Sequence, residues 1–262
     1  MCIRDSHYAL LSVGGELMAA FETSLAPVSL SPIVMQAVAL GVEQDKITTF
    51  LLPVQASNHP IYNPSLDYSV YLSQPFFFVL FQVLILLITV YAVGIEIKFR
   101  TADEWLFVAK GNMVTAVLGK LLPYTIIFIL IGWLANYVMF GILHIPFQGS
   151  WLLMNMLTAL FVVATQALGL FLFSLFPAIS LIISIVSMVG SLGATLSGVT
   201  FPVTNMYPLV RDASYLFPVR HFTEMMQNML YGGSGFIYLW PSVVILCIFP
   251  VSYTHLRAHE TV

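Results

Sequence analysis

The sequence predicts an all-α polytopic membrane protein, and two observations carry that prediction. Only 8% of the 262 residues are charged while 59% are hydrophobic, and the mean hydropathy is +0.93. In addition, residues 121–210 contain no Asp, Glu, Lys or Arg. A soluble domain of that length needs a charged surface, whereas hydrocarbon excludes charged side chains. A bilayer is therefore the expected solvent of this region.

Five visible segments are expected to be transmembrane helices, with ends uncertain by a few residues. They lie at about 75–95, 121–140, 151–176, 178–200 and 236–250. The last has 15 residues, fewer than the roughly 20 needed to cross the hydrocarbon core. We therefore expect this last span to be truncated.

Both ends of the chain resemble translated adapter sequence and are left out of the fold prediction. These ends are MCIRDS at 1–6 and VSYTHLRAHETV at 251–262. Residues 7–74 have no apolar run of spanning length and contain two stretches rich in Pro, Ser and Asn. They are expected to be the remnant of an external domain, so the natural protein is expected to be longer in both directions.

Positive charges near the span ends predict the orientation. Residues 96–120 carry Lys98, Arg100, Lys110 and Lys120, whereas the longer segment 201–235 carries only Arg211 and Arg220. Because short cytoplasmic loops are enriched in Lys and Arg, residues 96–120 are expected in the cytoplasm, and 7–74 and 201–235 outside the inner membrane.

Small and polar residues inside the spans are expected to hold helices together. Gly190, Ala194 and Gly198 repeat every four residues and would share one face, which suits close helix packing better than substrate lining. The polar residues are expected to form interhelical hydrogen bonds rather than to bind substrate; they are Gln82, Asn136, Asn155 and Gln166.

The charged stretch at about 97–111 predicts a short amphipathic helix. Thr101 with Glu104 three residues later has the pattern of a capping box, and Trp105 and Leu106 begin an apolar stripe. The stripe suits either a docking surface for another subunit or an interfacial helix lying on the membrane. The spacing alone favours neither.

The segment 201–235 is interrupted by charges and prolines, so it is expected to form two short helices at the outer interface. Pro208 and Pro218 suit first-turn positions. Such a segment could be a gate over a translocation route or an amphipathic plug that anchors helix ends, and the plug is slightly favoured by the residues alone.

Several function classes are disfavoured by what the sequence lacks. It has no Walker loop, HExxH, GxSxG or CxxC pattern, and no Asp, Glu, Lys or Arg lies in the predicted spans. We therefore expect no enzyme, no metal or cofactor site and no ion-coupled carrier. A net charge of -3 argues against nucleic acid. Energy for any active transport would have to come from another chain.

Four motifs, in a shared order, resemble those of the permease subunits of type-2 ABC exporters. The first two are Asn63-Pro64-Ser65-Leu66 and Gly94-x-Glu96 with Thr101, Glu104, Trp105 and Leu106. The third is a run expected to open the next span, Gly119-Lys120-Leu121-Leu122-Pro123. The fourth comprises Ser197-Gly198, Phe201-Pro202, Pro208 and Ser214-Tyr215-Leu216-Phe217-Pro218.

The resemblance implies a coupling helix and an outer gate. Trp105 and Leu106 would anchor the coupling helix to an ATPase, with rim charges from Glu96, Lys98, Arg100 and Glu104. Arg100 departs from the family, which usually has Gly there. The gate would occupy 201–235 and include Phe201, Pro202, Pro208, Phe217 and Pro218.

The resemblance also implies the partners. It predicts six spans, the first of them missing here, in a homodimer or heterodimer of permeases that binds a separate ABC ATPase. ATP would bind the ATPase and no cofactor would bind this chain. A periplasmic adaptor and membrane lipid are further expected partners. The expected function is export of an amphipathic or drug-like substrate; the alternative is a non-transporting membrane scaffold or assembly factor that docks a cytoplasmic partner.

Overall fold

The computed structural model describes residues 20, 39–40, 68–145, 147, 149–199, 203–231 and 236–258. The chain divides into two compact units, Met1–Tyr68 and Ser69–Val262. Nearly all of the predicted external remnant lies outside the described residues, as do Phe201 and Pro202. Every element in the described part of the second unit is helical, which confirms the predicted all-α membrane fold.

Five long helices and several short ones form this unit. The long ones are α3 (Tyr68–Lys98), α5 (Met113–Asn136), continued by the π-helical turn η2 (Tyr137–Ile142), α6 (Trp151–Leu175), α7 (Ile179–Leu196) and α10 (Phe236–Ala258). The short ones are α4 (Ala102–Val108), the 3-10 turn η3 (Val203–Asn205), α8 (Pro208–Ser214) and α9 (Pro218–Tyr231).

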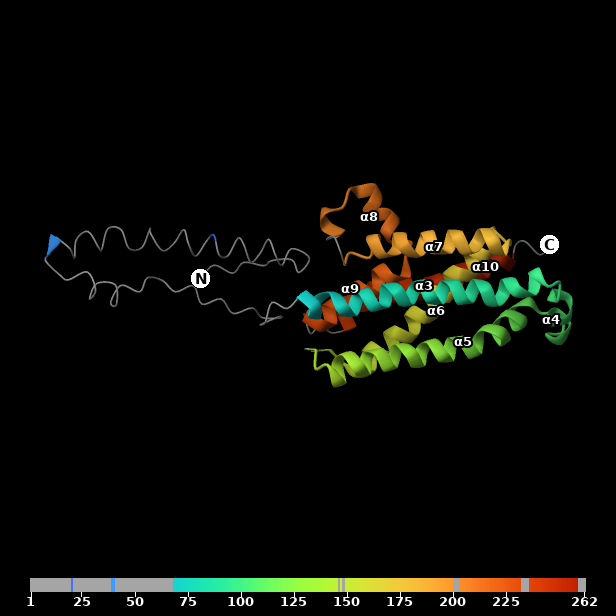
Figure 1. Ribbon diagram of the computed structural model, residues 1–262, viewed down its shortest axis with the longest axis horizontal. Coiled ribbons are helices and arrows are strands. Elements are labelled where there is room, and N and C mark those ends of the chain that lie inside the picture. Colours follow the sequence, from blue (N-terminus) through green and yellow to red (C-terminus); the bar gives the residue numbers. More distant parts are fainter. Residues whose placement is uncertain are drawn as a thin grey trace. The chain divides into compact units, whose positions relative to one another are not determined.

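Four of the described helices are long and apolar enough to cross a membrane. Their candidate spans are Leu72–Lys98, Met113–Ile142, Trp151–Leu175 and Ile179–Leu196. Helix α10 has a shorter apolar part, Leu239–Pro250. In Figure 1 the long helices lie side by side, with α4 at one end of the bundle and α8 and α9 toward the other.

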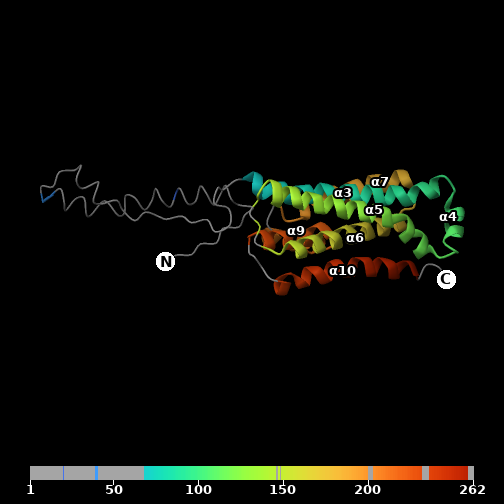
Figure 2. The same cartoon turned by 90° about the horizontal axis from the view of Figure 1, so that it is seen from below.

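The core joins helices that are distant in sequence. Phe78 of α3, Phe161 of α6 and Phe222 of α9 are fully buried, and Phe222 lies 4.6 Å from each of the other two ring centroids. Helix α10 packs against α6 and α9, and Figure 2 shows it running along that face of the bundle. A second apolar cluster, nearer α4, joins α3, α5, α6 and α7.

Two predicted span starts are wrong because the helices begin earlier. Helix α3 begins at Tyr68 and passes through Pro75, which removes one backbone hydrogen bond without ending the helix. Helix α5 begins at Met113, where the Asn112 side chain accepts hydrogen bonds from the backbone N–H groups of Val114 and Thr115. The motif Gly119 to Pro123 therefore lies inside a helix rather than at its start.

The last helix is also longer than predicted. Helix α10 has 23 residues and continues to Ala258, into the segment interpreted as adapter sequence. Pro241 and Pro250 lie within it without ending it. The foreign origin of 251–262 stays a prediction.

The predicted interhelical hydrogen bonds are confirmed. Asn136, the last residue of α5, donates to the side chains of Asn155 and Thr158 on α6, at 3.1 and 3.0 Å. Thr125 of α5 donates to Gln166 of α6 at 2.7 Å. Gln82 of α3 accepts from the backbone N–H of Val219 at 3.0 Å. Each of the four predicted residues thus takes part in a hydrogen bond to a neighbouring helix.

The three small residues of α7 have different environments. Gly190 packs α7 closely against α3, because a Cβ there would lie 2.7 Å from Val83. Ala194 is half-buried. Gly198 lies beyond the end of α7 and has a φ of +85°, so its glycine serves a left-handed turn rather than a helix face. The prediction that Gly198 continues the helix face is wrong.

Candidate functional site

Helix α4 is set between two tight turns. At the end of α3, Thr101 N–H bonds to Glu96 C=O and Arg100 N–H to Ile97 C=O, with Arg100 at a φ of 58°. After α4, Gly111 N–H bonds to Leu106 C=O and Lys110 N–H to Phe107 C=O. Both patterns are Schellman motifs, which end a helix through one left-handed residue. They fix the direction of α4 relative to α3 and α5.

The backbone conformation of Arg100 accounts for the Gly that the type-2 ABC permeases usually have at this position. A positive φ crowds the Cβ of any residue other than Gly and costs about 1–2 kcal/mol. Glycine at this position is therefore the unstrained choice, and Arg100 adopts the same turn with some strain.

The predicted capping box is not formed. The Thr101 side chain makes no capping hydrogen bond to α4. Its hydroxyl instead donates to the Glu96 carboxylate, which also binds the Lys120 ammonium of α5. Glu104 is exposed. The Glu96 carboxylate thus binds the residue before α4 and a residue of α5, and so connects the end of α3 to both helices.

Trp105 faces the bundle. It is half-buried and packs against the apolar cluster that includes Val117 and Leu121 of α5. The Lys120 Nζ lies 5.4 Å from the centroid of its ring, within cation–π range. Trp105 therefore holds α4 against the bundle. Lys120 contributes twice, through its ion pair with Glu96 and its cation–π contact with Trp105.

The outward face of α4 combines exposed apolar residues with the exposed carboxylates of Asp103 and Glu104. Phe107 and Val108 are 85% and 82% exposed, and none of the residues of α4 is buried. An open hollow of about 700 Å³ lies beside them, lined by Asp103, Leu106, Phe107, Val108, Lys110 and Gly111. Lys98 and Arg100 are exposed nearby in the chain. The helix predicted at about 97–111 is confirmed only over Ala102–Val108, because residues 97–98 belong to α3 and tight turns at Arg100 and Lys110 flank α4. Its most exposed apolar residues follow Trp105 and Leu106.

The other candidate site is the segment 201–235, which we call the outer segment after its predicted location. Pro208 and Pro218 begin α8 and α9, which confirms the two predicted short helices. Helix α8 is largely exposed, whereas α9 lies within the bundle, in contact with α6, α7 and α10. Phe217 is half-buried, and a Cβ on Gly193 of α7 would lie 3.2 Å from its ring.

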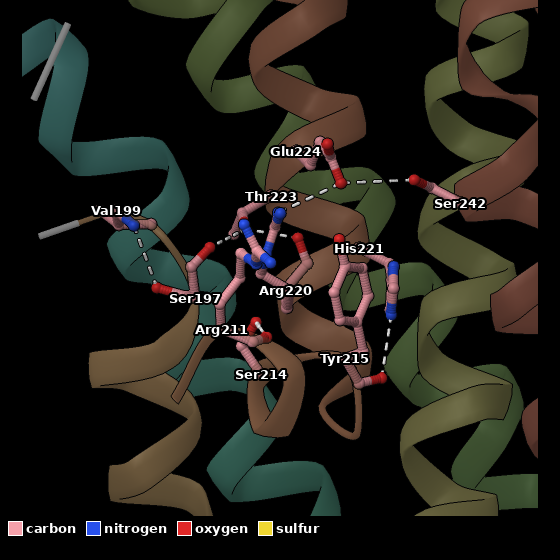
Figure 3. A network of polar contacts seen from close by, with 10 residues as sticks. All are labelled: Ser197, Val199, Arg211, Ser214, Tyr215, Arg220, His221, Thr223, Glu224 and Ser242. Atoms are coloured by element: carbon pink, nitrogen blue, oxygen red, sulfur yellow. Dashed lines mark hydrogen bonds and ion pairs between the residues drawn. The ribbon is translucent and has the colours of Figure 1, made fainter. Parts of the chain in front are cut away.

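Helix α9 brings charged residues into the bundle. Arg220 is 7% exposed and pairs with Glu224 at 3.1 Å, and Ser242 of α10 donates to Glu224 at 3.4 Å. Thr223 donates to the Ser197 carbonyl at 2.8 Å. Figure 3 shows these contacts joining α9 to its neighbours.

His221 is fully buried beside this pair. Burial lowers its pKa, which keeps the imidazole neutral, and Nε2 donates to the Tyr215 carbonyl at 3.0 Å. The sequence reasoning missed this cluster because it placed all of 201–235 at the interface. The strong amphipathicity of 218–231 is the signal that could have revealed a buried face.

Within the described residues, no group of three or more His, Cys, Asp or Glu side chains could hold a metal ion. The polar contacts at both ends of the bundle join helices to one another.

Comparison with known proteins identifies the family. A family model described as ABC-2 family transporter protein matches residues 17–256. The inner membrane transport permease YhhJ of Escherichia coli (strain K12) is 31% identical over 109 residues, 40% of this chain and 28% of that protein. The probable multidrug ABC transporter permease YbhS of the same strain is 25% identical over 166 residues, 62% of this chain and 43% of that protein.

The matched part thus covers less than half the length of these two relatives. No solved structure matches the chain. The family match covers most of the chain, including α4, the spans and the outer segment. The chain therefore belongs to the ABC-2 family of transporter proteins.

Proposed function

We propose that this chain is the membrane-spanning permease subunit of an ATP-driven exporter and that α4 binds a separate ABC ATPase. One observation carries the proposal: α4 is firmly fastened to the bundle yet leaves Phe107 and Val108 almost fully exposed. In this proposal the chain has no ATPase activity of its own, and ATP binds the partner.

The exposed face of α4 has the composition of a docking surface. Phe107 and Val108 supply apolar anchors, while Asp103 and Lys110, which line the same hollow, supply opposite charges that can set the register. Leu106 lines the hollow, so it remains an anchor in the proposal. Trp105 instead holds α4 against the bundle.

The contacts of Glu96 with Thr101 and Lys120 connect the proposed docking helix to two membrane-spanning helices. Glu96 lies in the last turn of α3, and its carboxylate binds Thr101 before α4 and Lys120 in α5. A displacement of α4 would therefore be passed to two long helices. This is the physical basis on which we propose that ATPase closure moves the bundle.

The positive residues around α4 support a cytoplasmic location for residues 96–120, with 201–235 on the external side of the inner membrane. The proposed substrate is amphipathic or drug-like, in keeping with the name of one relative, a probable multidrug ABC transporter permease. A periplasmic adaptor remains part of the proposal.

We also propose a dimer with a second permease. Helix α7 exposes hydroxyl side chains at spacings of three and four residues, which places them on one face; they are Ser180, Ser184, Ser187, Ser191 and Thr195. Their hydroxyls bond back to their own helix where a partner is observed. A polar stripe of this kind suits a neighbouring helix better than lipid.

Co-purification tests the ATPase contact. The parent protein should purify from native membranes with a protein that hydrolyses ATP, whereas Phe107→Asp with Val108→Asp should lose it. The matched control is Leu209→Asp on α8, where Leu209 is also largely exposed, at 74%. Retention of the ATPase by the double variant, or equal loss with Leu209→Asp, would contradict docking through α4.

A further inference from the structure

Helix α9 begins inside the bundle, where its first backbone N–H groups need partners. The first four N–H groups of a helix have no acceptor within it, and burying one unbonded in an apolar region is costly. Pro218 has no N–H, and Arg220 N–H bonds to the Phe217 carbonyl at 3.1 Å. Val219 N–H is satisfied by a different helix, because it donates to Gln82 Oε1 of α3 at 3.0 Å.

Helices α3, α7 and α9 meet at the Gln82 side chain. Gln82 is fully buried, and its Nε2 has no hydrogen-bond partner within the described part of the chain. A Cβ on Gly193 of α7 would lie 2.7 Å from that Nε2 and 3.6 Å from Val219. Gly193 thus makes room for the Gln82 amide between α7 and α9.

Gln82 and Glu96 lie on one helix. No proline separates them, since the proline of α3 is Pro75. Their fourteen-residue separation corresponds to about 21 Å along an α-helix. Helix α3 therefore holds α4 at one end through Glu96 and α9 farther along through Gln82.

We propose that Gln82 is a positioning residue for transport: it caps the start of α9, holds that helix inside the bundle, and releases it when α3 moves. The inference rests on the proposed function only for the movement of α3. The capping role stands on the geometry of Gln82, Val219 and Gly193 alone.

The specificity of the contact comes from its chemistry. A methionine at 82 has a similar length but offers the Val219 N–H only a weak sulfur acceptor. A glutamic acid keeps the oxygen acceptor, and its protonated form is neutral in the apolar bundle. Capping therefore predicts opposite outcomes for these two substitutions, whereas simple space filling predicts similar ones.

Labelling of a buried cysteine measures the release of α9. Met226 of α9 is fully buried, so Met226→Cys in a background without Cys2 and Cys247 should react slowly with a water-soluble maleimide. Adding Gln82→Met should raise the labelling rate about tenfold without ATP, as expected when loss of the hydrogen bond costs about 1.4 kcal/mol. Gln82→Glu should label at the parent rate.

The matched control is Gln166→Met, which removes another buried glutamine bond, the one that joins α6 to Thr125 of α5. It should leave the labelling rate unchanged. Gly193→Ala should act like Gln82→Met, whereas Gly119→Ala, where a Cβ meets no atom within 4 Å, should not. Equal labelling in Gln82→Met and the parent, or equal acceleration by Gln166→Met, would overturn the capping role.

A second arm separates this inference from the proposed function. With the ATPase bound, ATP should accelerate labelling in the parent and have little further effect in Gln82→Met. If Gln82→Met accelerates labelling while ATP never does in the parent, the cap is supported and movement driven through α3 is overturned. The melting temperatures of all variants show whether accelerated labelling reflects global unfolding.

Discussion

Helices α4 and α9 lie toward opposite ends of the bundle, and both are short helices that carry charged residues (Figure 1). They differ in what covers their apolar side chains. Helix α4 has no buried residue, whereas α9 fully buries Phe222 and Met226 and nearly buries Arg220. The difference leaves the apolar residues of α4 open to the contact that we propose with an ATPase, whereas α9 is held by the chain itself.

Their charges are arranged in correspondingly different ways. Near α4, Glu96 and Lys120 link separate helices, and α4's own Asp103 and Glu104 are exposed. In α9, Arg220 and Glu224 pair within one helix, and Ser242 and Ser197 connect this region to its neighbours. Substitutions in the two helices should therefore have unequal effects.

The largest expected effect comes from the aromatic residues. Phe222→Ala should lower the free energy of unfolding by about 3–5 kcal/mol, because it leaves a cavity beside Phe78 and Phe161. Phe107→Ala should change it by less than about 0.5 kcal/mol, since its ring is exposed. Thermal unfolding in detergent measures both. Similar losses of unfolding free energy in the two variants would contradict the difference in burial between α9 and α4.

The Arg220–Glu224 ion pair should give the next effect. Glu224→Gln leaves the buried Arg220 without its carboxylate, but the Glu224 side chain is 40% exposed, so the cost should be about 1–2 kcal/mol. Adding Arg220→Met removes the unpaired charge and should recover part of that loss. Glu104→Gln on α4 is the matched control and should be neutral in the same unfolding assay. No recovery in the double variant would show that Arg220 does not need Glu224.

Loosening α4 should have a smaller, local effect. Lys120→Met removes the ammonium that binds Glu96 and lies over Trp105. Hydrogen exchange of the amides at 102–110 should accelerate about fivefold, which corresponds to about 1 kcal/mol. Lys98→Met changes an exposed lysine and should leave the exchange unchanged. Unaltered exchange in Lys120→Met would mean that the network does not fasten α4.

The turn before α4 should give a small gain. Arg100→Gly relieves a φ of 58° and should stabilise the protein by about 1 kcal/mol. Lys98→Gly, placed in the last turn of α3, should instead destabilise it by a similar amount. Opposite shifts in melting temperature are the expected result, and two losses would show that Arg100 is unstrained.

The membrane fold, the interhelical hydrogen bonds and the two short helices α8 and α9 could be predicted from the sequence. Charge-free length identifies spans because hydrocarbon excludes ions, and amide side chains inside spans favour hydrogen bonds between helices. Span ends were less predictable. Lys120 looked like the end of a loop, but its pairing with Glu96 lets α5 begin at Met113.

The roles of individual residues in α4 and α9 needed tertiary structure. Thr101 and Glu104 have the spacing of a capping box, yet Thr101 binds Glu96 instead. Trp105 and Phe107 are both apolar, and only the packing of α5 decides which faces inward. The Gln82 contact joins residues 137 positions apart, which no local pattern can indicate.

ATP-dependent transport tests the central claim most directly. Inside-out vesicles containing this permease and its ATPase should accumulate an amphipathic fluorescent substrate when ATP is added. Phe107→Asp with Val108→Asp should abolish the uptake, and Leu209→Asp should preserve it. Uptake that survives the α4 variant would contradict coupling through α4. Stable ATPase binding without ATP-dependent uptake of any substrate tried would favour a membrane scaffold over an exporter.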